Sequence, residues 1–264
     1  MKELCVIGCG VMGEAVLGGI VKSGLIVPEN ITVTRRDSEA LRKLNEKFGV
    51  KTTSDNREAV SRSDVVIIAL KPQVLDSTAK EFGGDIRGDA LVISIAAGKT
   101  LQKLEDFFPG RKIIRAMPNL PALVSAGMSI MCGNERVTSE DMATALRLFK
   151  TFGGAEELPE RLMDAAMSVA SCSPAYVAVF IEALADAGVK MGLTRRQSLA
   201  LAEHAVYGTA KLLIDTDTHP AVLKDRVCSP GGTTIEAVSV LEDKGFRGAI
   251  IQAAESALRR AKEL

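Results

Sequence analysis

The chain has 264 residues, of which 47% are hydrophobic and 25% charged, and its 33 basic side chains balance 33 acidic ones. This length and composition predict a globular protein, and two domains rather than one. A net charge of zero gives no electrostatic attraction for nucleic acid or for anionic membranes, so neither is an expected partner.

The N-terminus has a basic start followed by an apolar run, as a secretory signal does. Glycines interrupt this run and Glu14 lies inside it, so we interpret it as the first strand and loop of a nucleotide-binding fold. We expect no other segment with an apolar run long enough to cross a bilayer. Cytoplasm is the expected location.

Five cysteines are scattered along the chain without a C-x-x-C pair, and the two histidines, His204 and His219, are far from any cysteine pair. This pattern predicts neither a disulfide framework nor a zinc site. We expect buried or spectator thiols and no bound metal.

The first half of the chain alternates short β-branched runs with helical stretches, the pattern of a parallel sheet covered by helices. Several runs are apolar at nearly every position, which is typical of strands buried on both faces. The expected strands are Leu4–Ile7, Ile31–Thr34, Val65–Leu70, Leu91–Ile95, Lys112–Ala116 and Met128–Cys132, and the expected helices include Gly13–Ser23, Ser38–Phe48 and Thr100–Phe107. The fold class is α/β, with a Rossmann-type, doubly wound, mostly parallel sheet in residues 1–159.

Residues 160–264 show no strand pattern and are expected to form an all-α domain. Capping residues and prolines mark the helix starts. The predicted helices begin with Ser173 as N-cap and run to Met191, begin after Thr194 and run to about Ile214, open at His219-Pro220, and run from about Gly248 to the end. Four alanines on the last helix (253, 254, 257 and 261) permit close packing, in either a compact bundle or an oligomer interface, and we favour the oligomer.

A glycine-rich loop, Gly8-Cys9-Gly10-Val11-Met12-Gly13, follows the first apolar strand and opens an amphipathic helix. In this context the loop is a dinucleotide fingerprint. Gly8 permits the tight turn, Gly10 lets a pyrophosphate approach the backbone, and Gly13 lets helix and strand pack closely.

The second strand ends in Arg35-Arg36, where an NAD-specific site has an acidic residue for the ribose hydroxyls. Two guanidinium groups can bind a 2′-phosphate instead, so NADPH is the expected cofactor. Two alternatives stay open: a register shift that places Asp37 at the ribose would admit NADH, and both arginines could simply be solvated at a strand end.

Two later strands end in Ala69-Leu70-Lys71-Pro72 and in Ala96-Ala97-Gly98, at the carboxyl edge where ligands lie in open α/β sheets. We expect these segments to line the nicotinamide side of the cofactor. Lys71 could be a catalytic acid, but a solvated lysine or one that binds backbone carbonyls is the preferred interpretation.

Near the C-terminus, Ser229-Pro230-Gly231-Gly232-Thr233-Thr234 precedes the amphipathic run Ile235–Leu241. Such a turn delivers free amide groups at a helix N-terminus, flanked by hydroxyls, and can receive a carboxylate. An ordinary capped turn explains the same residues equally well when they are considered alone.

Two segments resemble those of one known family. The stretch Arg115–Ala122, which contains Met117, Pro118 and Asn119, and the stretch Asp225–Ile235 are similar to motifs of pyrroline-5-carboxylate reductases. The glycine loop and Asn56 also lie at that family's usual positions, so the resemblance covers essentially the whole chain. Leu120 departs from the pattern, because threonine is usual there.

The resemblance implies reduction of the cyclic imine 1-pyrroline-5-carboxylate to L-proline with NADPH, or with NADH. It implies a homo-oligomer formed through the helical domain, either a dimer or dimers assembled into a decamer. The cofactor-binding residues would be 8–13, Arg35, Arg36, Asn56, 69–72, 96–98 and 117–119; Ser229 and residues 231–234 would bind the substrate. Thr234 would be the catalytic residue, with its hydroxyl facing the ring nitrogen.

When the nitrogen of an imine is protonated, its carbon accepts hydride without a strong general acid. This agrees with the lack of an obvious His-Asp pair. A β-hydroxyacid dehydrogenase shares the two-domain plan, but Lys190-Met191-Gly192-Leu193 lacks the asparagine that such enzymes place near their lysine. A non-catalytic NADPH sensor is the alternative from another class.

Overall fold

The computed structural model describes residues 3–263. Contacts between residues divide the chain into two compact units. The first, called the sheet unit below, runs to Ser171 and includes the residues from Arg260 onward. The second, the helical unit, comprises Cys172–Arg259.

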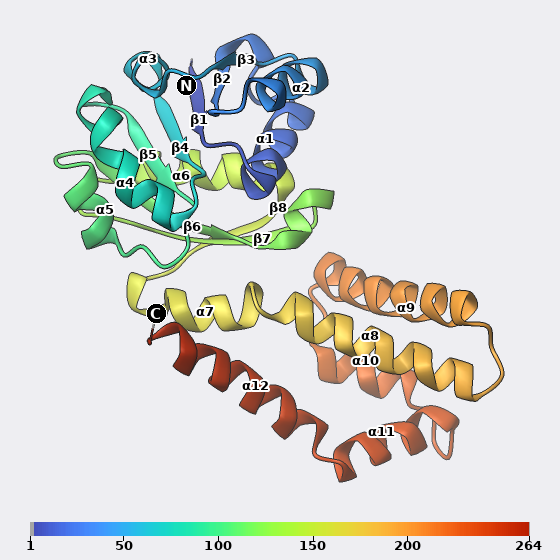
Figure 1. The fold of residues 1–264 in the computed structure, drawn as a ribbon. Coiled ribbons are helices and arrows are strands. Elements are labelled where there is room, and N and C mark those ends of the chain that lie inside the picture. Colours follow the sequence, from blue (N-terminus) through green and yellow to red (C-terminus); the bar gives the residue numbers. More distant parts are fainter. Residues whose placement is uncertain (1–2, 264) are drawn as a thin grey trace. The chain divides into compact units, whose positions relative to one another are not determined.

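The sheet unit is built on one sheet of eight strands in the order β3-β2-β1-β4-β5-β6-β7-β8 (Figure 1). The strands are β1 (Leu4–Ile7), β2 (Ile31–Thr34), β3 (Lys51–Thr53), β4 (Val65–Ile68), β5 (Leu91–Ser94), β6 (Lys112–Pro118), β7 (Gly127–Gly133) and β8 (Gly153–Glu157). Neighbours pair in parallel except β6 and β7, which are antiparallel. The direction of winding reverses between β1 and β4, and open α/β sheets bind their ligands at this switch point.

Helices cover both faces of the sheet (Figure 1). They are α1 (Val11–Ser23), α2 (Ser38–Phe48), α3 (Asn56–Arg62), α4 (Pro72–Phe82), α5 (Leu101–Phe107) and α6 (Ser139–Phe149). Short 3₁₀ turns η1 (Pro28–Asn30), η2 (Gly83–Asp85), η3 (Leu120–Val124), η4 (Lys150–Phe152) and η5 (Glu160–Leu162) connect elements.

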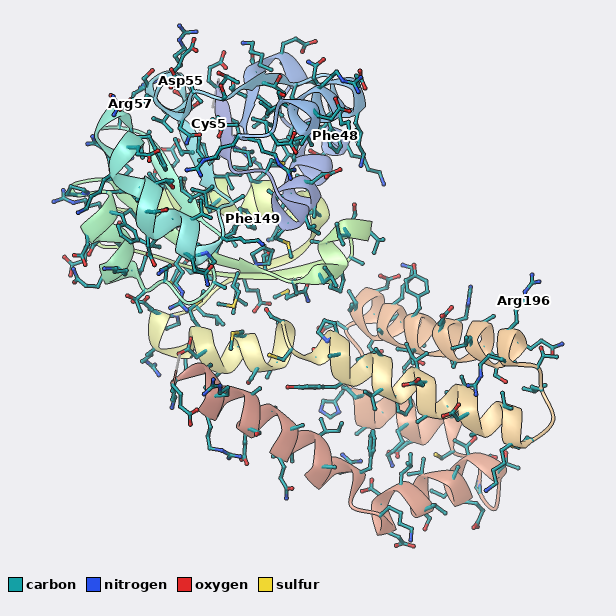
Figure 2. The ribbon with its side chains drawn as sticks, in the orientation of Figure 1. Cys5, Phe48, Asp55, Arg57, Phe149 and Arg196 are labelled. Atoms are coloured by element: carbon teal, nitrogen blue, oxygen red, sulfur yellow. The ribbon has the colours of Figure 1, made fainter. Side chains whose placement is uncertain are left out.

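Side chains of β1 alternate between two apolar cores. Leu4 and Val6 pack in the core that contains residues of α1, α2 and α6, while Cys5 and Ile7 pack in the core formed with α3, α4 and α5. Cys5 and Phe149, labelled in Figure 2, belong to these two different cores. A strand that is apolar at every position is thus buried on both faces, as the sequence pattern predicts.

The predicted fold class is confirmed, and the bounds of β1, β2 and α2 agree with the prediction. The predicted ends of β4 and β5 were wrong by one or two residues, because Ala69, Leu70 and Ile95 already belong to the loops after those strands. Strands β3 and β8 were missed. Their sequences, Lys-Thr-Thr and Gly-Gly-Ala-Glu-Glu, lack the apolar runs by which the other strands are recognised.

The sheet unit extends past residue 159, where we placed the domain boundary. Helix α7 (Met163–Ala170) packs on the sheet through the fully buried Met163, which contacts a small core with Met117 and Cys132. The chain therefore changes unit between Ser171 and Cys172, twelve residues later than expected.

The helical unit contains α8 (Ser173–Lys190), α9 (Arg195–Thr216), α10 (Pro220–Val227), α11 (Thr233–Asp243) and most of α12 (Phe246–Ala261). Thr194 caps α9 through a capping box with Gln197, and the His219 ring accepts from the Ala221 amide at the start of α10, as predicted. Helix α8 starts one residue earlier than predicted, without a side-chain cap, and α12 starts two residues earlier.

One segment corrects our expectation about membrane-length runs. Glu160–Lys190 is long and apolar enough to cross a bilayer by length and composition. Single polar and small residues interrupt its apolar side chains, which hides the segment from a search for an unbroken run. It consists of two helices, α7 and α8, and α7 packs on the sheet. The apolar surface of α8 therefore fits a protein interface at least as well as a bilayer.

Candidate functional site

The three glycines of the first loop have three different environments. Gly8 has φ +78°, and a Cβ there would lie 2.2 Å from Leu70 Cδ2. A Cβ on Gly13 would lie 2.9 Å from the Ala69 Cβ, so the close approach of α1 to the end of β4 requires glycine. A Cβ on Gly10, in contrast, would meet nothing within 4 Å. Open space at Gly10 is what a bound pyrophosphate needs.

Gly10 is also the N-cap of α1, and no side chain caps this helix. The first intrahelical bond runs from the Glu14 amide to the Gly10 carbonyl, at 2.8 Å. The amides of Val11, Met12 and Gly13 precede that bond, and such first-turn donors bind anions. The sheet reverses its winding at this same point. The residues present therefore fit a dinucleotide.

Cys9, within the loop, is fully buried. Burial raises the pKa of its thiol to about 12, Glu14 raises it further, and Arg35 opposes the shift. The thiol stays protonated and adds no negative charge beside a pyrophosphate. Arg35 Nη1 donates to the Cys9 carbonyl oxygen at 3.1 Å, so this guanidinium braces the loop from the end of β2.

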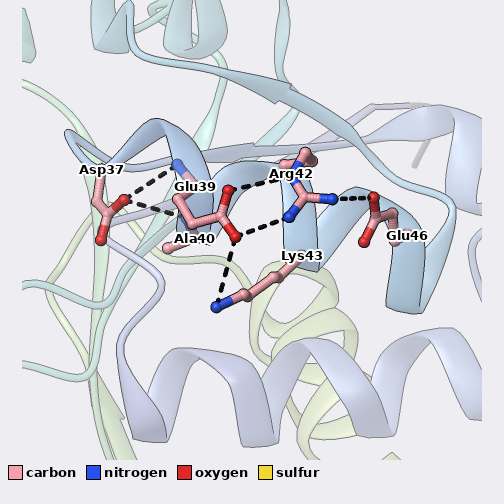
Figure 3. A network of polar contacts seen from close by, with 6 residues as sticks. All are labelled: Asp37, Glu39, Ala40, Arg42, Lys43 and Glu46. Atoms are coloured by element: carbon pink, nitrogen blue, oxygen red, sulfur yellow. Dashed lines mark hydrogen bonds and ion pairs between the residues drawn. The ribbon is translucent and has the colours of Figure 1, made fainter.

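Arg36 and Asp37, next along the chain, differ in their partners. Both are exposed, and Arg36 lines the cavity described below. One Asp37 carboxylate oxygen accepts from the amides of Glu39 and Ala40 at 3.0 and 3.1 Å, which caps α2 (Figure 3). Asp37 serves as a helix cap and does not line the cavity described below, so the structure gives no support to the alternative in which it binds ribose hydroxyls.

A cavity of about 350 Å³ lies at the carboxyl ends of β1, β2 and β4. Thr34 and Asn56 both line the cavity, and the Thr34 hydroxyl donates to the Asn56 side-chain oxygen at 2.6 Å. The Asn56 side-chain nitrogen therefore remains available to donate to a ligand. The lining residues are Gly8, Gly10, Thr34, Arg35, Arg36, Ser54, Asn56, Ala69, Leu70, Lys71, Val74, Thr78 and Glu81. Eight of these were predicted to bind the cofactor.

Lys71 is the N-cap of α4 and is exposed. Pro72 follows it as the start of that helix. The Lys71 backbone carbonyl accepts from the amides of Val74 and Leu75, both at 2.9 Å. A solvated lysine at a helix start agrees with the preferred interpretation, in which Lys71 is not a catalytic acid.

Sequence reasoning missed five lining residues: Thr34, Ser54, Val74, Thr78 and Glu81. Thr34 could have been found as the last residue of β2, since strand ends line such sites. The others lie on α4 or in the loop after β3, and β3 itself was missed.

Two predicted cofactor-binding segments, 96–98 and 117–119, do not line this cavity. Gly98 has φ +70°, and the loop that contains it is fixed by an ion pair of 2.7 Å between Lys99 and Asp76 of α4. Met117 and Pro118 are buried in β6. Asn119 is also buried, and both polar atoms of its side chain bond within the sheet unit.

The second predicted turn lies in the helical unit, before α11. Gly231 has φ +66°, and Gly232 is the N-cap of α11 without a side-chain cap. A Cβ on Gly232 would lie 2.3 Å from the Ser229 hydroxyl oxygen, and the Gly232 amide donates to the Ser229 carbonyl at 3.0 Å. Ser229 and Thr233 are exposed and Thr234 is half-buried. The ordinary side-chain-capped turn is thus not what forms, and the first-turn amides of α11 are free for an anion.

Histidines, cysteines and acidic residues offer no metal centre: within residues 3–263, no group of three or more His, Cys, Asp or Glu side chains could hold an ion. Cys5, Cys9 and Cys132 are buried single thiols. Burial raises the pKa of Cys5 and of Cys132 to about 12 as well, so these thiols are inert near neutral pH.

Two family models match the chain. Residues 3–98 match NADP oxidoreductase, coenzyme F420-dependent, and residues 160–264 match pyrroline-5-carboxylate reductase dimerisation. The first match contains the glycine loop and every residue that lines the cavity, and the second contains the Ser229–Thr234 turn together with all of the helical unit.

Individual relatives match over nearly their full length. The pyrroline-5-carboxylate reductase of Escherichia coli (strain K12) is 44% identical over 264 residues, 100% of this chain and 98% of the relative. A solved structure of a pyrroline-5-carboxylate reductase from Coxiella burnetii aligns with a TM-score of 0.96 at 33% identity, covering 99% of this chain and 98% of that one. The Plasmodium falciparum pyrroline carboxylate reductase, solved with NADP bound, aligns with a TM-score of 0.85 at 32% identity, covering 99% and 97%. Since such identity extends through both the glycine loop and the turn before α11, the chain belongs to the pyrroline-5-carboxylate reductase family.

Proposed function

We propose that this protein reduces 1-pyrroline-5-carboxylate to L-proline with NADPH. The observation that carries the proposal is the identity of 44% to a pyrroline-5-carboxylate reductase over all 264 residues. The two uncapped helix starts, at Gly10 and at Gly232, supply separate receptors for a pyrophosphate and for a carboxylate. A non-catalytic NADPH sensor would have no use for the second receptor.

In the proposed reaction the substrate carboxylate is bound by Ser229 and by the Thr233 amide. The Gly232 amide, which we also expected to bind it, instead donates to the Ser229 carbonyl at 3.0 Å. Gly231 supplies the left-handed turn that these groups require. The Thr234 hydroxyl faces the ring nitrogen of the imine. When bound, the nicotinamide supplies a hydride, which adds to the imine carbon while the nitrogen keeps a proton. The chain's own task is to orient the imine and exclude water.

NADPH is the proposed cofactor because Arg36 lines the cavity and forms no ion pair within residues 3–263, and because Asp37 is used as a helix cap. An exposed guanidinium can bind a 2′-phosphate with charge-assisted hydrogen bonds. NADH would bind without that contribution, and so more weakly. A relative from Plasmodium falciparum, solved with NADP bound, supports the same preference.

We also propose that the protein works as a homo-oligomer in the cytoplasm. The helical unit falls within the residues that match the dimerisation model, 160–264. A dimer is the simplest assembly, and dimers could associate further into a decamer. The zero net charge and the exposed apolar helices agree with a self-associating metabolic enzyme rather than with a nucleic-acid partner.

The deciding experiment adds pyrroline-5-carboxylate to the purified protein with NADPH, and separately with NADH, and follows loss of the reduced-cofactor absorbance. We expect saturable oxidation with one proline formed per NADPH, and a lower Michaelis constant for NADPH than for NADH. Tight NADPH binding without any imine reduction would refute the proposed reaction and favour the sensor. Oxidation of NADPH with the carbonyl product of a β-hydroxyacid, and none with the imine, would favour the dehydrogenase.

A further inference from the structure

Helix α7 is the last element of the sheet unit before the chain enters the helical unit. The helical unit, which carries the Ser229–Thr234 turn, therefore begins where α7 ends. The apolar contact of Met163 with the sheet holds α7 down. Apolar contacts are not directional, so they alone do not fix the position of a helix along a sheet.

At the N-terminal end of α7, a buried arginine supplies the directional contacts. The Arg115 side chain, on β6, is only 7% exposed, and its Nη1 and Nη2 lie 3.2 Å from Glu160 Oε1 and 3.4 Å from Asp164 Oδ1. The same Glu160 oxygen accepts from the Leu101 amide at 2.7 Å. One carboxylate thus joins β6, the start of α5 and the entry to α7.

At the C-terminal end of α7, an asparagine does the same. Asn119 follows directly after β6 and is 8% exposed. Its Nδ2 donates to the carbonyl of Ala170, the last residue of α7, at 2.8 Å, and its Oδ1 accepts from the Met128 amide at 2.8 Å. Carbonyls in the last turn of a helix have no partner within the helix, so this bond satisfies one of them.

We propose that Arg115 and Asn119 are positioning residues of the reductase, which clamp α7 at both ends and thereby set where the substrate-binding helices leave the sheet unit. Neither side chain lines the cofactor cavity. The inference rests on the proposed function, because it requires that the carboxylate turn and the nicotinamide meet in a defined geometry. Displacement of a reacting group by about 1 Å can lower a rate about a hundredfold.

The test compares Asn119→Asp with Asn134→Asp. The first keeps the acceptor for the Met128 amide and removes the donor to Ala170. Asn134 is a matched control, since its side chain bridges in the same way, with Oδ1 accepting from the Ile113 amide and Nδ2 donating to Glu105 and to the Arg111 carbonyl, but it does not contact α7. Arg115→Met and the conservative Arg115→Lys probe the other end of α7.

We expect Asn119→Asp and Arg115→Met to lower kcat/KM for pyrroline-5-carboxylate about tenfold or more per NADPH-binding site. The dissociation constant of NADPH should stay within twofold of the wild-type value. The oligomeric state should not change. Arg115→Lys should recover part of the rate, and Asn134→Asp should keep the wild-type rate per site, however much it lowers stability.

Wild-type kinetics per site in both variants would overturn the proposal, as would a loss of rate that only parallels lost NADPH binding or lost assembly. A wild-type protein that does not reduce the imine at all would refute the proposed function and with it the catalytic part of this inference. Hydrogen exchange of the α7 amides then decides the clamp separately: faster exchange in Asn119→Asp than in Asn134→Asp supports it, and equal exchange refutes it.

Discussion

Replacing Gly10 by alanine separates binding from folding in the glycine loop. Gly10 has φ −86° and ψ −162°, a backbone conformation that any residue adopts, and its Cβ would meet nothing within 4 Å. Alanine is a poorer N-cap than glycine, by about 0.5–1 kcal/mol. It also restricts the unfolded chain, which contributes about 0.4–1 kcal/mol in the opposite direction. The free energy of unfolding should therefore change by less than about 0.5 kcal/mol.

The affinity of Gly10→Ala for NADPH should fall much further. The added methyl group occupies the space in which a pyrophosphate would approach the first-turn amides of α1. Loss of one hydrogen bond to a charged group costs about 1.5–3 kcal/mol, or roughly tenfold to a hundredfold in affinity.

Gly8→Ala, two residues earlier in the same loop, is the matched comparison. Its φ of +78° strains any L-residue by about 1–2 kcal/mol, and its Cβ would lie 2.2 Å from Leu70 Cδ2. Overpacking of this kind adds about 1–3 kcal/mol. We expect Gly8→Ala to lose about 2–5 kcal/mol of stability.

Urea unfolding followed by circular dichroism, at one protein concentration, and NADPH titration followed by cofactor fluorescence would measure both effects. Wild-type affinity in Gly10→Ala would show that the pyrophosphate does not pass over this residue. Equal destabilisation of the two variants would show that the space at Gly10 is not open in solution.

Arg36→Ala should raise the dissociation constant of NADPH about tenfold and leave that of NADH within twofold, because only NADPH carries the 2′-phosphate; equal losses in two parallel titrations would exclude this role. Thr234→Val, which keeps the side-chain shape, should lower kcat/KM for the imine about tenfold at unchanged NADPH affinity, and unchanged steady-state kinetics would remove Thr234 from the reaction. Burial raises the pKa of the Cys5, Cys9 and Cys132 thiols from 9.0 to about 12, so above pH 9 the unfolded chain loses protons that the folded chain keeps. Stability should therefore fall as pH rises, by about 1 kcal/mol per thiol between pH 9 and 10, and urea midpoints that do not decrease over this range would contradict the assignment.

Residue patterns alone predicted the parts of the fold in which local and tertiary preferences agree. The strand Leu4–Ile7 is apolar throughout, is followed by glycines and lies inside the sheet between β2 and β4, so each level of description indicates the same structure. The strand β3 is polar and lies at the edge, and its formation depends on pairing with β2 rather than on burial. Edge strands of this kind have no distinctive local sequence.

The cavity illustrates a different limit. The positions of the glycines and the ends of the strands predicted eight of its lining residues, because these patterns are local in the sequence. Asp37 could not be assigned from the sequence, since whether its carboxylate caps α2 or reaches a ribose depends on a shift of one residue. Its bonds to the Glu39 and Ala40 amides, and its position outside the cavity lining, favour the cap.

The boundary of the sheet unit depends on contacts that no helix pattern contains. The sequence of α7 resembles that of the helices after it, and the change from strands to helices at Pro159 suggests a boundary there. What assigns α7 to the sheet unit is the burial of Met163 and the contacts of Arg115 and Asn119, residues more than 40 positions earlier in the chain. These long-range contacts are also the ones that a positioning role requires.

The helical unit has only a small apolar core of its own. Only four of its residues are buried in the single chain, namely Ala185, Gly188, Ser198 and Ala202, all where α8 crosses α9. Gly188 permits that crossing, because a Cβ there would lie 2.6 Å from the Ser198 hydroxyl. Large apolar side chains such as Val179, Leu201 and Ile214 are more than 60% exposed. So small a core does little to offset the conformational entropy of a unit of this size, which agrees with the match of residues 160–264 to a dimerisation model.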